Sequence, residues 1–254
     1  MNILAIGDVV GTAATDVLID KLQGVKKLYN IDFVVVNGEN AAGHGIATDQ
    51  AQAILDAGAD VITLGNHTLD QHGIVSFLND CRYILRPANF GLHMPGHGWG
   101  VFETSFGNVY VINLIGRLYT SNDLNPFIEA DSIIKQLEQA KVILVDFHAE
   151  TTFEKLALAY YLDGRVSALW GTHTHVQTSD YKVLPGGTGY ITDLGMTGPE
   201  NSVIGGKPDQ IISSFLDNPS EEYEIAEGPI RIEGAVFEVN TDTGLCLGVE
   251  AIRV

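Results

Sequence analysis

The chain has 254 residues, a hydrophobic fraction of 45% and a formal net charge of −18. Its length and apolar content suit one large domain covering residues 1–254, and the strong negative charge without any Lys/Arg-rich block argues against duplex nucleic acid as a partner. Two widely spaced cysteines, a first predicted strand at residue 2 and apolar runs too short to cross a bilayer favour a cytoplasmic protein with no signal peptide and no membrane association.

Apolar runs alternate with amphipathic stretches along most of the chain, which predicts an α/β fold. In the first half we expect strands at 2–7, 32–37, 60–64, 83–86 and 108–115, with helices at 12–29, 48–57 and 70–79. In the second half we expect a helix from Pro126 to about Ala140, strands at 142–147, 166–170 and 189–193, and helices at 152–163 and 209–216. The segments 91–100 and 193–208 are expected to be irregular loops. Two β runs at 230–240 and 246–253 surround a turn at 241–244, which predicts a hairpin added to a sheet edge.

Five short polar clusters follow five of the predicted strands, where an α/β sheet presents its chemistry. The clusters are Gly7-Asp8, Asn37-Gly38-Glu39-Asn40, Gly65-Asn66-His67, Asp146-Phe147-His148 and Gly171-Thr172-His173-Thr174-His175. Taken singly, each has an ordinary explanation as a helix cap, a turn or a buried histidine. Together they supply carboxylates, carboxamides and imidazoles in sufficient number to hold two metal ions.

The chemistry of these clusters points to a catalytic metal centre. Oxygen and nitrogen ligands without thiolate argue against a structural zinc finger and suit iron or manganese, with zinc also compatible. If His173 and His175 continue a strand, they point to the same side and can address one site together. His67 follows Asn66 directly, so its imidazole would lie beside the metals, either as a proton donor or as a simple hydrogen-bonding neighbour.

The order of these residues resembles the calcineurin-like metallophosphoesterase superfamily, whose motifs are D-x-H, G-D, G-N-H-(D/E), a later His and G-H-x-H. The chain departs from this pattern because Val10 stands where the first His is usual and Glu39 replaces the G-D carboxylate. Both departures match the YmdB-like phosphodiesterases. The chain resembles that family over nearly its whole length, in the stretches 7–11, 86–90, 146–150, 163–165, 171–178 and 192–199.

The resemblance implies a four-layer α/β/β/α sandwich with a dinuclear centre, with iron as the first expectation for both metals. Carried over by motif, the first metal would be held by Asp8, Asn40 and His175. The second would be held by Asn66, His148 and His173. Glu39 would bridge the two metals, and His67 would be the catalytic proton donor. Leu69, Phe153 and the segment 43–46 depart from the relatives near the expected rim, which leaves substrate choice open.

The activity implied by the resemblance is hydrolysis of cyclic nucleotides, foremost 2′,3′-cyclic ones, with 3′,5′-cyclic AMP as a further substrate. We expect a hydroxide activated by the two metals to attack phosphorus while His67 protonates the leaving oxygen. Small phosphodiesters suit a positive centre in an acidic protein, and relatives suggest a homo-oligomer. Arg86, Arg117 and Arg165 are read either as phosphate ligands or as structural ion-pair partners.

Two other functions use the same residues and stay open at this point. A broad-specificity phosphomonoesterase would need further cations for a dianionic substrate, and the sequence shows no cluster of them. A metal-bound regulatory protein with incidental catalysis would use the acidic surface for docking. A Rossmann-type nucleotide module is discounted, since Gly7–Gly11 lacks the G-x-G-x-x-G pattern.

Overall fold

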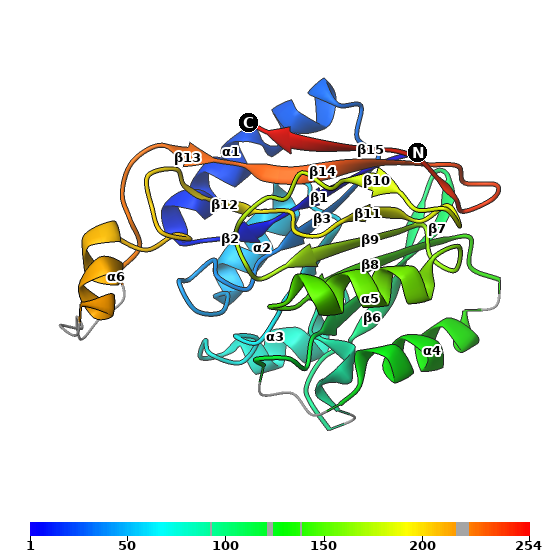
Figure 1. Ribbon diagram of the computed structural model, residues 1–254, viewed down its shortest axis with the longest axis horizontal. Coiled ribbons are helices and arrows are strands. Elements are labelled where there is room, and N and C mark those ends of the chain that lie inside the picture. Colours follow the sequence, from blue (N-terminus) through cyan, green and yellow to red (C-terminus); the bar gives the residue numbers. More distant parts are fainter. Residues whose placement is uncertain (92, 121–123, 138, 217–223) are drawn as a thin grey trace.

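The computed structural model describes residues 1–91, 93–120, 124–137, 139–216 and 224–254 (Figure 1). Within these residues, two six-stranded sheets carry the architecture, with strand orders β15-β14-β1-β3-β4-β5 and β10-β11-β9-β8-β7-β6. The first sheet consists of β1 (Asn2–Ile6), β3 (Phe33–Asn37), β4 (Val61–Thr63), β5 (Ile84–Leu85), β14 (Glu233–Val239) and β15 (Cys246–Arg253). The second consists of β6 (Trp99–Thr104), β7 (Gly107–Ile115), β8 (Val142–His148), β9 (Ala168–Thr172), β10 (Lys182–Val183) and β11 (Gly189–Ile191).

A small third sheet and the helices complete the described elements. The small sheet pairs β2 (Asp8–Val9), β12 (Met196–Pro199) and β13 (Ile230–Arg231). The helices are α1 (Thr12–Leu28), α2 (Thr48–Asp56), α3 (Ile74–Asp80), α4 (Pro126–Gln136), α5 (Thr152–Leu162) and α6 (Pro208–Phe215), with a 3₁₀ turn, η1, at Ala88–Phe90. In Figure 1, α6 stands apart from the sheets at one end of the molecule. Among the described residues, no helix combines the length and the apolar character that crossing a bilayer requires.

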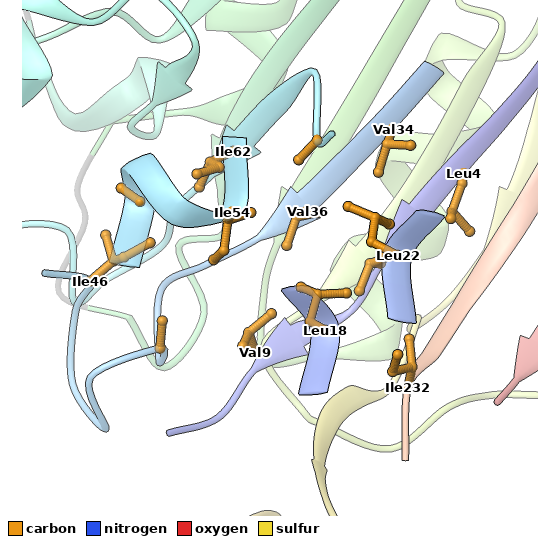
Figure 2. Packing of buried hydrophobic residues seen from close by; sticks show 14 of the residues in the cluster. Leu4, Val9, Leu18, Leu22, Val34, Val36, Ile46, Ile54, Ile62 and Ile232 are labelled. Carbon is orange, nitrogen blue, oxygen red and sulfur yellow. The ribbon is translucent and has the colours of Figure 1, made fainter. Parts of the chain in front are cut away.

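Three buried apolar clusters define four layers. The first joins the outer face of the first sheet to α1, α2 and α3, and Figure 2 shows Leu18 and Leu22 of α1 beside Leu4, Val34 and Val36 of the strands. The second cluster fills the space between the two sheets. The third joins the second sheet to α4 and α5. The predicted α/β/β/α sandwich is therefore confirmed.

Local sequence explains the elements that position the site. Helix α1 buries Ala14, Leu18, Leu22 and Val25, a spacing that forms one helical stripe. The strands β3 and β8 are buried along their whole length, as expected for parallel strands covered on both faces. Strands β1, β3, β4 and β5 run parallel, as do β7, β8, β9 and β11, so their carboxyl ends gather at common edges.

The C-terminal hairpin lies where the sequence predicts it. Strand β14 pairs antiparallel with β1, and β15 forms the edge beyond it. The first sheet is thus built from both ends of the chain. The single domain over residues 1–254 stays a prediction.

Several predicted bounds differ from the structure by a few residues, as in α4, which ends at Gln136 and not near Ala140, and β9, which covers Ala168–Thr172 and not 166–170. Three differences are larger. The helix expected at 70–79 begins only at Ile74, because Gly73 adopts a left-handed backbone (φ 84°) that a continuing helix cannot contain. Strand β6 covers Trp99–Thr104, partly inside a segment predicted to be irregular, because it pairs along β7. Strand β12 lies inside the loop predicted at 193–208, where it pairs with β2.

Candidate metal centre

The seven predicted metal ligands form one continuous network of contacts at the carboxyl ends of the parallel strands. They are Asp8, Glu39, Asn40, Asn66, His148, His173 and His175. They follow or end β1, β3, β4, β8 and β9, which belong to both large sheets. Segments separated by up to 165 residues meet here, as in the contact of the His173 amide with Asp8.

His148 is the hub of this network. Its Nε2 lies 2.9 Å from Glu39 Oε1, 3.2 Å from Asn66 Oδ1 and 3.0 Å from His173 Nδ1. On the other side of the ring, Nδ1 lies 2.9 Å from Thr172 Oγ1.

The Thr172 hydroxyl sets the tautomer of this ring. It donates its own proton to Asp146 Oδ1 at 2.8 Å, so it accepts the Nδ1–H of His148. In the neutral ring that a metal would bind, the site-facing Nε2 of His148 then carries a lone pair, and this lone pair faces further acceptors. Such a group of acceptors is stabilised by a cation between them.

His173 and His175 have the same arrangement. The Nε2 of His173 lies 3.0 Å from Glu150 Oε2, so its Nδ1 turns a lone pair to the site. The Nδ1 of His175 lies 2.8 Å from the carbonyl oxygen of Ile204, so its Nε2 is the site-facing atom. In each of the three imidazoles, an outer acceptor fixes the ring in the form that a metal requires.

Asp8 forms the second part of the network. Its carboxylate is fully buried, and Oδ2 accepts a hydrogen bond of 3.1 Å from the His173 backbone amide. Its Oδ1 has no hydrogen-bond partner among the described residues and lies 3.8 Å from His175 Nε2. Asn40 reaches the same nitrogen at 3.1 Å through its side-chain amide group.

Burial and mutual charge interactions displace the pKa values of the network in both directions. Burial raises the pKa of Asp8 to about 6, although His175 and His148 act in the opposite direction. Burial would also raise the pKa of Glu39, but the charge and hydrogen bond of His148 lower it to about 2. For His148, burial lowers the pKa, yet Glu39 and the other carboxylates raise it to about 9. Burial and the charge of His148 lower the pKa of His173 to about 3.

Gly65 is required by the close approach of these ligands. A Cβ atom at this position would lie 2.1 Å from Glu39 Oε2 and 2.3 Å from His148 Nε2. The backbone conformation is not the reason, because Gly65 is not among the residues with positive φ. The glycine of the Gly65-Asn66-His67 cluster therefore makes room for the ligands of neighbouring strands.

The two histidines of the H-x-H segment reach the site by a different route from the predicted one. Strand β9 ends at Thr172, and His173 and His175 adopt left-handed backbone conformations with φ of 97° and 62°. They therefore do not alternate as in a strand. His173 faces His148, whereas His175 faces Asp8.

A buried ion pair holds this segment in place. Lys155 Nζ lies 2.6 Å from Asp193 Oδ2, and both side chains are buried. The same carboxylate accepts hydrogen bonds from the hydroxyl of Thr174 at 2.7 Å and from its amide at 3.3 Å. Asp193 thus fixes the residue between the two histidines.

His67 lies beside the ligands on the loop after β4. Its backbone amide donates to Glu39 Oε2 at 3.3 Å, and its ring nitrogen Nδ1 lies 2.6 Å from Asp70 Oδ2. The other nitrogen, Nε2, lies 3.4 Å from His44 Nδ1. A cavity of about 300 Å³ is lined by these histidines together with Glu39, Asn40, Glu150, His173 and His175.

Several supporting residues escaped the sequence reasoning. Asp146, Thr172, Glu150 and Asp70 each contact a histidine or its hydrogen-bond partner, and no spacing rule marks them in advance. Asp146 is fully buried, and burial raises its pKa. It accepts hydrogen bonds from side chains of β3, β4 and β9, which joins the two sheets directly behind the ligands.

The three arginines considered for phosphate binding lie elsewhere. Arg165 forms an ion pair of 2.6 Å with Asp131, which makes it structural. Neither Arg86 nor Arg117 lines the cavity beside the predicted ligands. His44 does line it, so this histidine, considered but not chosen from the sequence, belongs to the cavity wall.

Solved structures share this architecture and define its class. A crystal structure described as a novel phosphatase of Mycoplasma pneumoniae superposes with a TM-score of 0.92 at 35% identity, covering 100% of this chain and 93% of the other. A hypothetical protein from Thermus thermophilus superposes with a TM-score of 0.93 at 34% identity, covering 100% and 99%. The fold is that of the metallophosphoesterase type.

Sequence comparison narrows the class to one family. The model of the YmdB-like protein family matches residues 4–252. A Bacillus subtilis protein named 2′,3′-cyclic-nucleotide 2′-phosphodiesterase is 41% identical over 256 residues, covering 100% of this chain and 97% of the relative. The chain belongs to the YmdB-like protein family.

Proposed function

We propose that the chain is a metal-dependent phosphodiesterase whose main substrates are 2′,3′-cyclic nucleotides. The observation that carries the proposal is the convergence of Glu39, Asn66 and His173 on the Nε2 of His148. Further support comes from the name of the Bacillus subtilis relative, which is 41% identical. A 3′,5′-cyclic nucleotide such as cyclic AMP is a second substrate within the same proposal.

The donor set fits two metal ions. Asp8 has a buried oxygen without a partner among the described residues, and three imidazoles each turn a lone pair to the cluster. In our assignment Asp8, Asn40 and His175 hold the first ion. Asn66, His148 and His173 would hold the second, and Glu39 would contribute to both. Iron is the first choice for both, with manganese or zinc compatible with the same ligands.

When bound, such ions lower the pKa of a water molecule and offset negative charge on a phosphoryl group. Side chains of the protein hold the metal ligands and His67 in position. Asp146 and Glu150 keep the ligand imidazoles in fixed tautomers and orientations, the first through Thr172 and the second directly. Asn66 and the glycine before it place the His67 backbone against Glu39.

His67 carries the proton for the leaving group in this mechanism. Asp70 accepts the Nδ1–H and fixes the ring, which leaves Nε2 in the cavity. A proton held at Nε2 is placed for donation to the oxygen that leaves phosphorus.

The size of the cavity suits a small substrate. Its volume of about 300 Å³ is at the lower end of the range for small-molecule sites. The surrounding chain carries a net charge of −18, which repels long polyanions while the cation site attracts a single phosphate group. A cyclic nucleotide meets both conditions.

A substrate panel tests the proposal. The protein is assayed with 2′,3′-cyclic AMP, 3′,5′-cyclic AMP, bis-p-nitrophenyl phosphate and p-nitrophenyl phosphate, with iron, manganese or zinc supplied. We expect the highest kcat/KM with the 2′,3′-cyclic nucleotide and the lowest with the monoester. Preference for the monoester would replace this proposal with a phosphomonoesterase.

Self-association and a cytoplasmic location belong to the same proposal. Helix α6 has no buried residue, and its Ile212 and Phe215 are 53% and 84% exposed. Such an apolar helix face suits contact with a second copy of the chain. Sedimentation analysis of a Phe215→Asp variant tests the contact, and cell fractionation tests the location. A monomeric wild type would remove the oligomer from the proposal.

A further inference from the structure

A second cavity lies away from the metal ligands. It has a volume of about 1020 Å³ and is bounded by residues around β5, by the start of β6 and by helix α4. It shares no lining residue with the cavity beside His67. A ligand of this cavity would therefore be recognised by a separate set of residues.

Arg86 provides the first argument for a ligand there. Its side chain lines the cavity, although the residue is only 8% exposed. One amino nitrogen donates to the carbonyl oxygens of Pro87 at 2.8 Å and Ala88 at 3.1 Å, which fixes the guanidinium. Among the described residues, its buried Nε has no hydrogen-bond partner, and no carboxylate lies within ion-pair distance of the guanidinium. A buried guanidinium with an unused donor is stabilised by an anion.

The charges in the lining favour an anion as well. The chain contains 14 Lys and Arg residues against 32 Asp and Glu, yet Arg82, Arg86, His93 and His97 all line this cavity. Glu129 is the one acidic residue in its described lining. Burial lowers the pKa of Arg86, and Glu129 offsets this only in part. A small anion can enter this local positive site, whereas the acidic surface around it repels a polyanion.

The remaining wall combines apolar side chains with the polar Ser132 and Gln136, and it contains a flat aromatic ring. Trp99 is partly buried and lines the cavity together with Ala88 and Ile133. Indole rings stack on planar bases, and an arginine pair binds phosphate oxygens through several donors. One ligand class presents both features in one small molecule.

We propose that this cavity is a second ligand site that binds a nucleoside monophosphate, with the phosphate at Arg86 and Arg82 and the base against Trp99. The site is independent of the metal centre in its residues. In this proposal, a nucleotide-sized anion lies beside β5 and η1. Its occupancy is separate from the catalytic proposal, and either proposal can fail alone.

Intrinsic fluorescence of the metal-loaded protein tests the site. Its two tryptophans are Trp99 in the cavity wall and Trp170, which is 1% exposed in the core. We expect 5′-AMP to change the emission in a saturable manner. Inorganic phosphate and adenosine each represent one part of 5′-AMP. Each should bind at least about 10-fold more weakly than 5′-AMP itself. In the Trp99→Phe variant the signal should vanish while calorimetry still detects binding.

Two variants with opposite expected effects on the affinity for 5′-AMP make the test sharper. Arg82→Gln should weaken 5′-AMP binding by about 10-fold, and Glu129→Gln should tighten it, because the single carboxylate of the described lining is removed. Arg165→Gln is the matched control, since Arg165 pairs with Asp131 outside the cavity. Both cavity variants keep the buried Arg86 and its backbone contacts, so a folding defect does not obscure the result.

Three results would overturn the proposal. One is the absence of a saturable change in Trp99 emission with 5′-AMP. Another is equal binding by the Arg82→Gln and Arg165→Gln variants. The third is equal affinity for inorganic phosphate and 5′-AMP, which would leave an anion site without recognition of a base.

Discussion

Two groups of histidines and carboxylates each contribute two residues to the lining of the same cavity, and they differ in burial and in position on the fold. The inner group consists of Glu39, His148 and His173, and the outer group consists of His44, His67 and Asp70. The inner group is anchored at strand ends, and its Glu39 and His148 are fully buried. The outer group lies on loops, where the His67 and Asp70 side chains are 28% and 46% exposed.

This difference separates cation binding from proton transfer. In the inner group, burial opposes both charged forms, yet the charge and hydrogen bond of His148 lower the pKa of Glu39 to about 2, and Glu39 with the other carboxylates raises that of His148 to about 9. The outer group keeps contact with water, and a carboxylate orients one of its rings. Similar residue types therefore serve different chemistry because the strands bury one group and leave the other at the rim.

The largest expected effect is the loss of the inner group's carboxylate. Glu39→Gln removes the charge that we place between the two metals, so we expect metal content and activity to fall together. The loss in kcat/KM should exceed ~10⁴-fold, the upper end of what a general acid contributes. Elemental analysis and steady-state kinetics measure both, with the exposed Glu238→Gln as control. Full metal content in the variant would refute the bridging role.

Removing the outer imidazole should separate activity from metal content. His67→Ala should lower kcat by ~10²–10⁴-fold, because the leaving oxygen loses its proton donor. Metal content should stay at the wild-type level, since His67 is not assigned as a ligand. Activity near that of the wild type would show that His67 is not the donor.

The buried ion pair of Lys155 and Asp193, which holds the H-x-H segment, should contribute to the stability of the fold. Lys155→Met leaves Asp193 buried without its cation, which costs about 3–5 kcal/mol of unfolding free energy. Denaturant unfolding of the variant measures this loss, with Lys135→Met on the exposed part of α4 as control. Equal stability of the two variants would mean that the pair does not hold the H-x-H segment.

A single methyl group added at Gly65 should lower activity less than the loss of the Glu39 charge. Gly65→Ala places a Cβ atom against Glu39 and His148, and the resulting shift of about 1 Å should cost about 10²-fold in activity. Gly24→Ala is the matched control, because its Cβ atom would meet nothing within 4 Å in helix α1. If both variants keep full activity, the close packing of the ligands is not required.

The smallest effect concerns the orientation of the outer ring. Asp70→Asn keeps a hydrogen-bonding side chain but replaces the charged oxygen that accepts the Nδ1–H of His67 with a weaker, neutral acceptor. We expect kcat to fall about 10-fold, with the KM unchanged. In the His67→Ala background the same change should have no further effect. An additive loss in the double variant would place Asp70 outside this dyad.

The sequence predicts the inner group better than the outer one for a physical reason. Glu39, Asn66, His148 and the H-x-H pair all follow buried apolar runs, and parallel strands bring their carboxyl ends together. Asp70 acts through a loop contact to His67, and no periodic pattern marks it. The hydrogen bond of Thr172 to Asp146 likewise depends on the pairing of β8 with β9.

The same reasoning explains the errors in the fold. Strand β6 contains Gly100 and follows a glycine-rich segment, so its own composition gives a weak β signal. Its pairing with β7, in which Trp99 lies opposite Ile112, stabilises it from outside. The H-x-H pair was expected to alternate as in a strand, but Asp193 holds Thr174 and turns both histidines through left-handed backbone.

The central claim is that the inner group, and not the outer one, holds a pair of metal ions. Anomalous diffraction from crystals of the iron-loaded protein tests it most directly. The account predicts two peaks within coordination distance of Glu39, one beside His148 and one beside His175. A single peak beside His44 and Asp70, or no peak near Glu39, would contradict it.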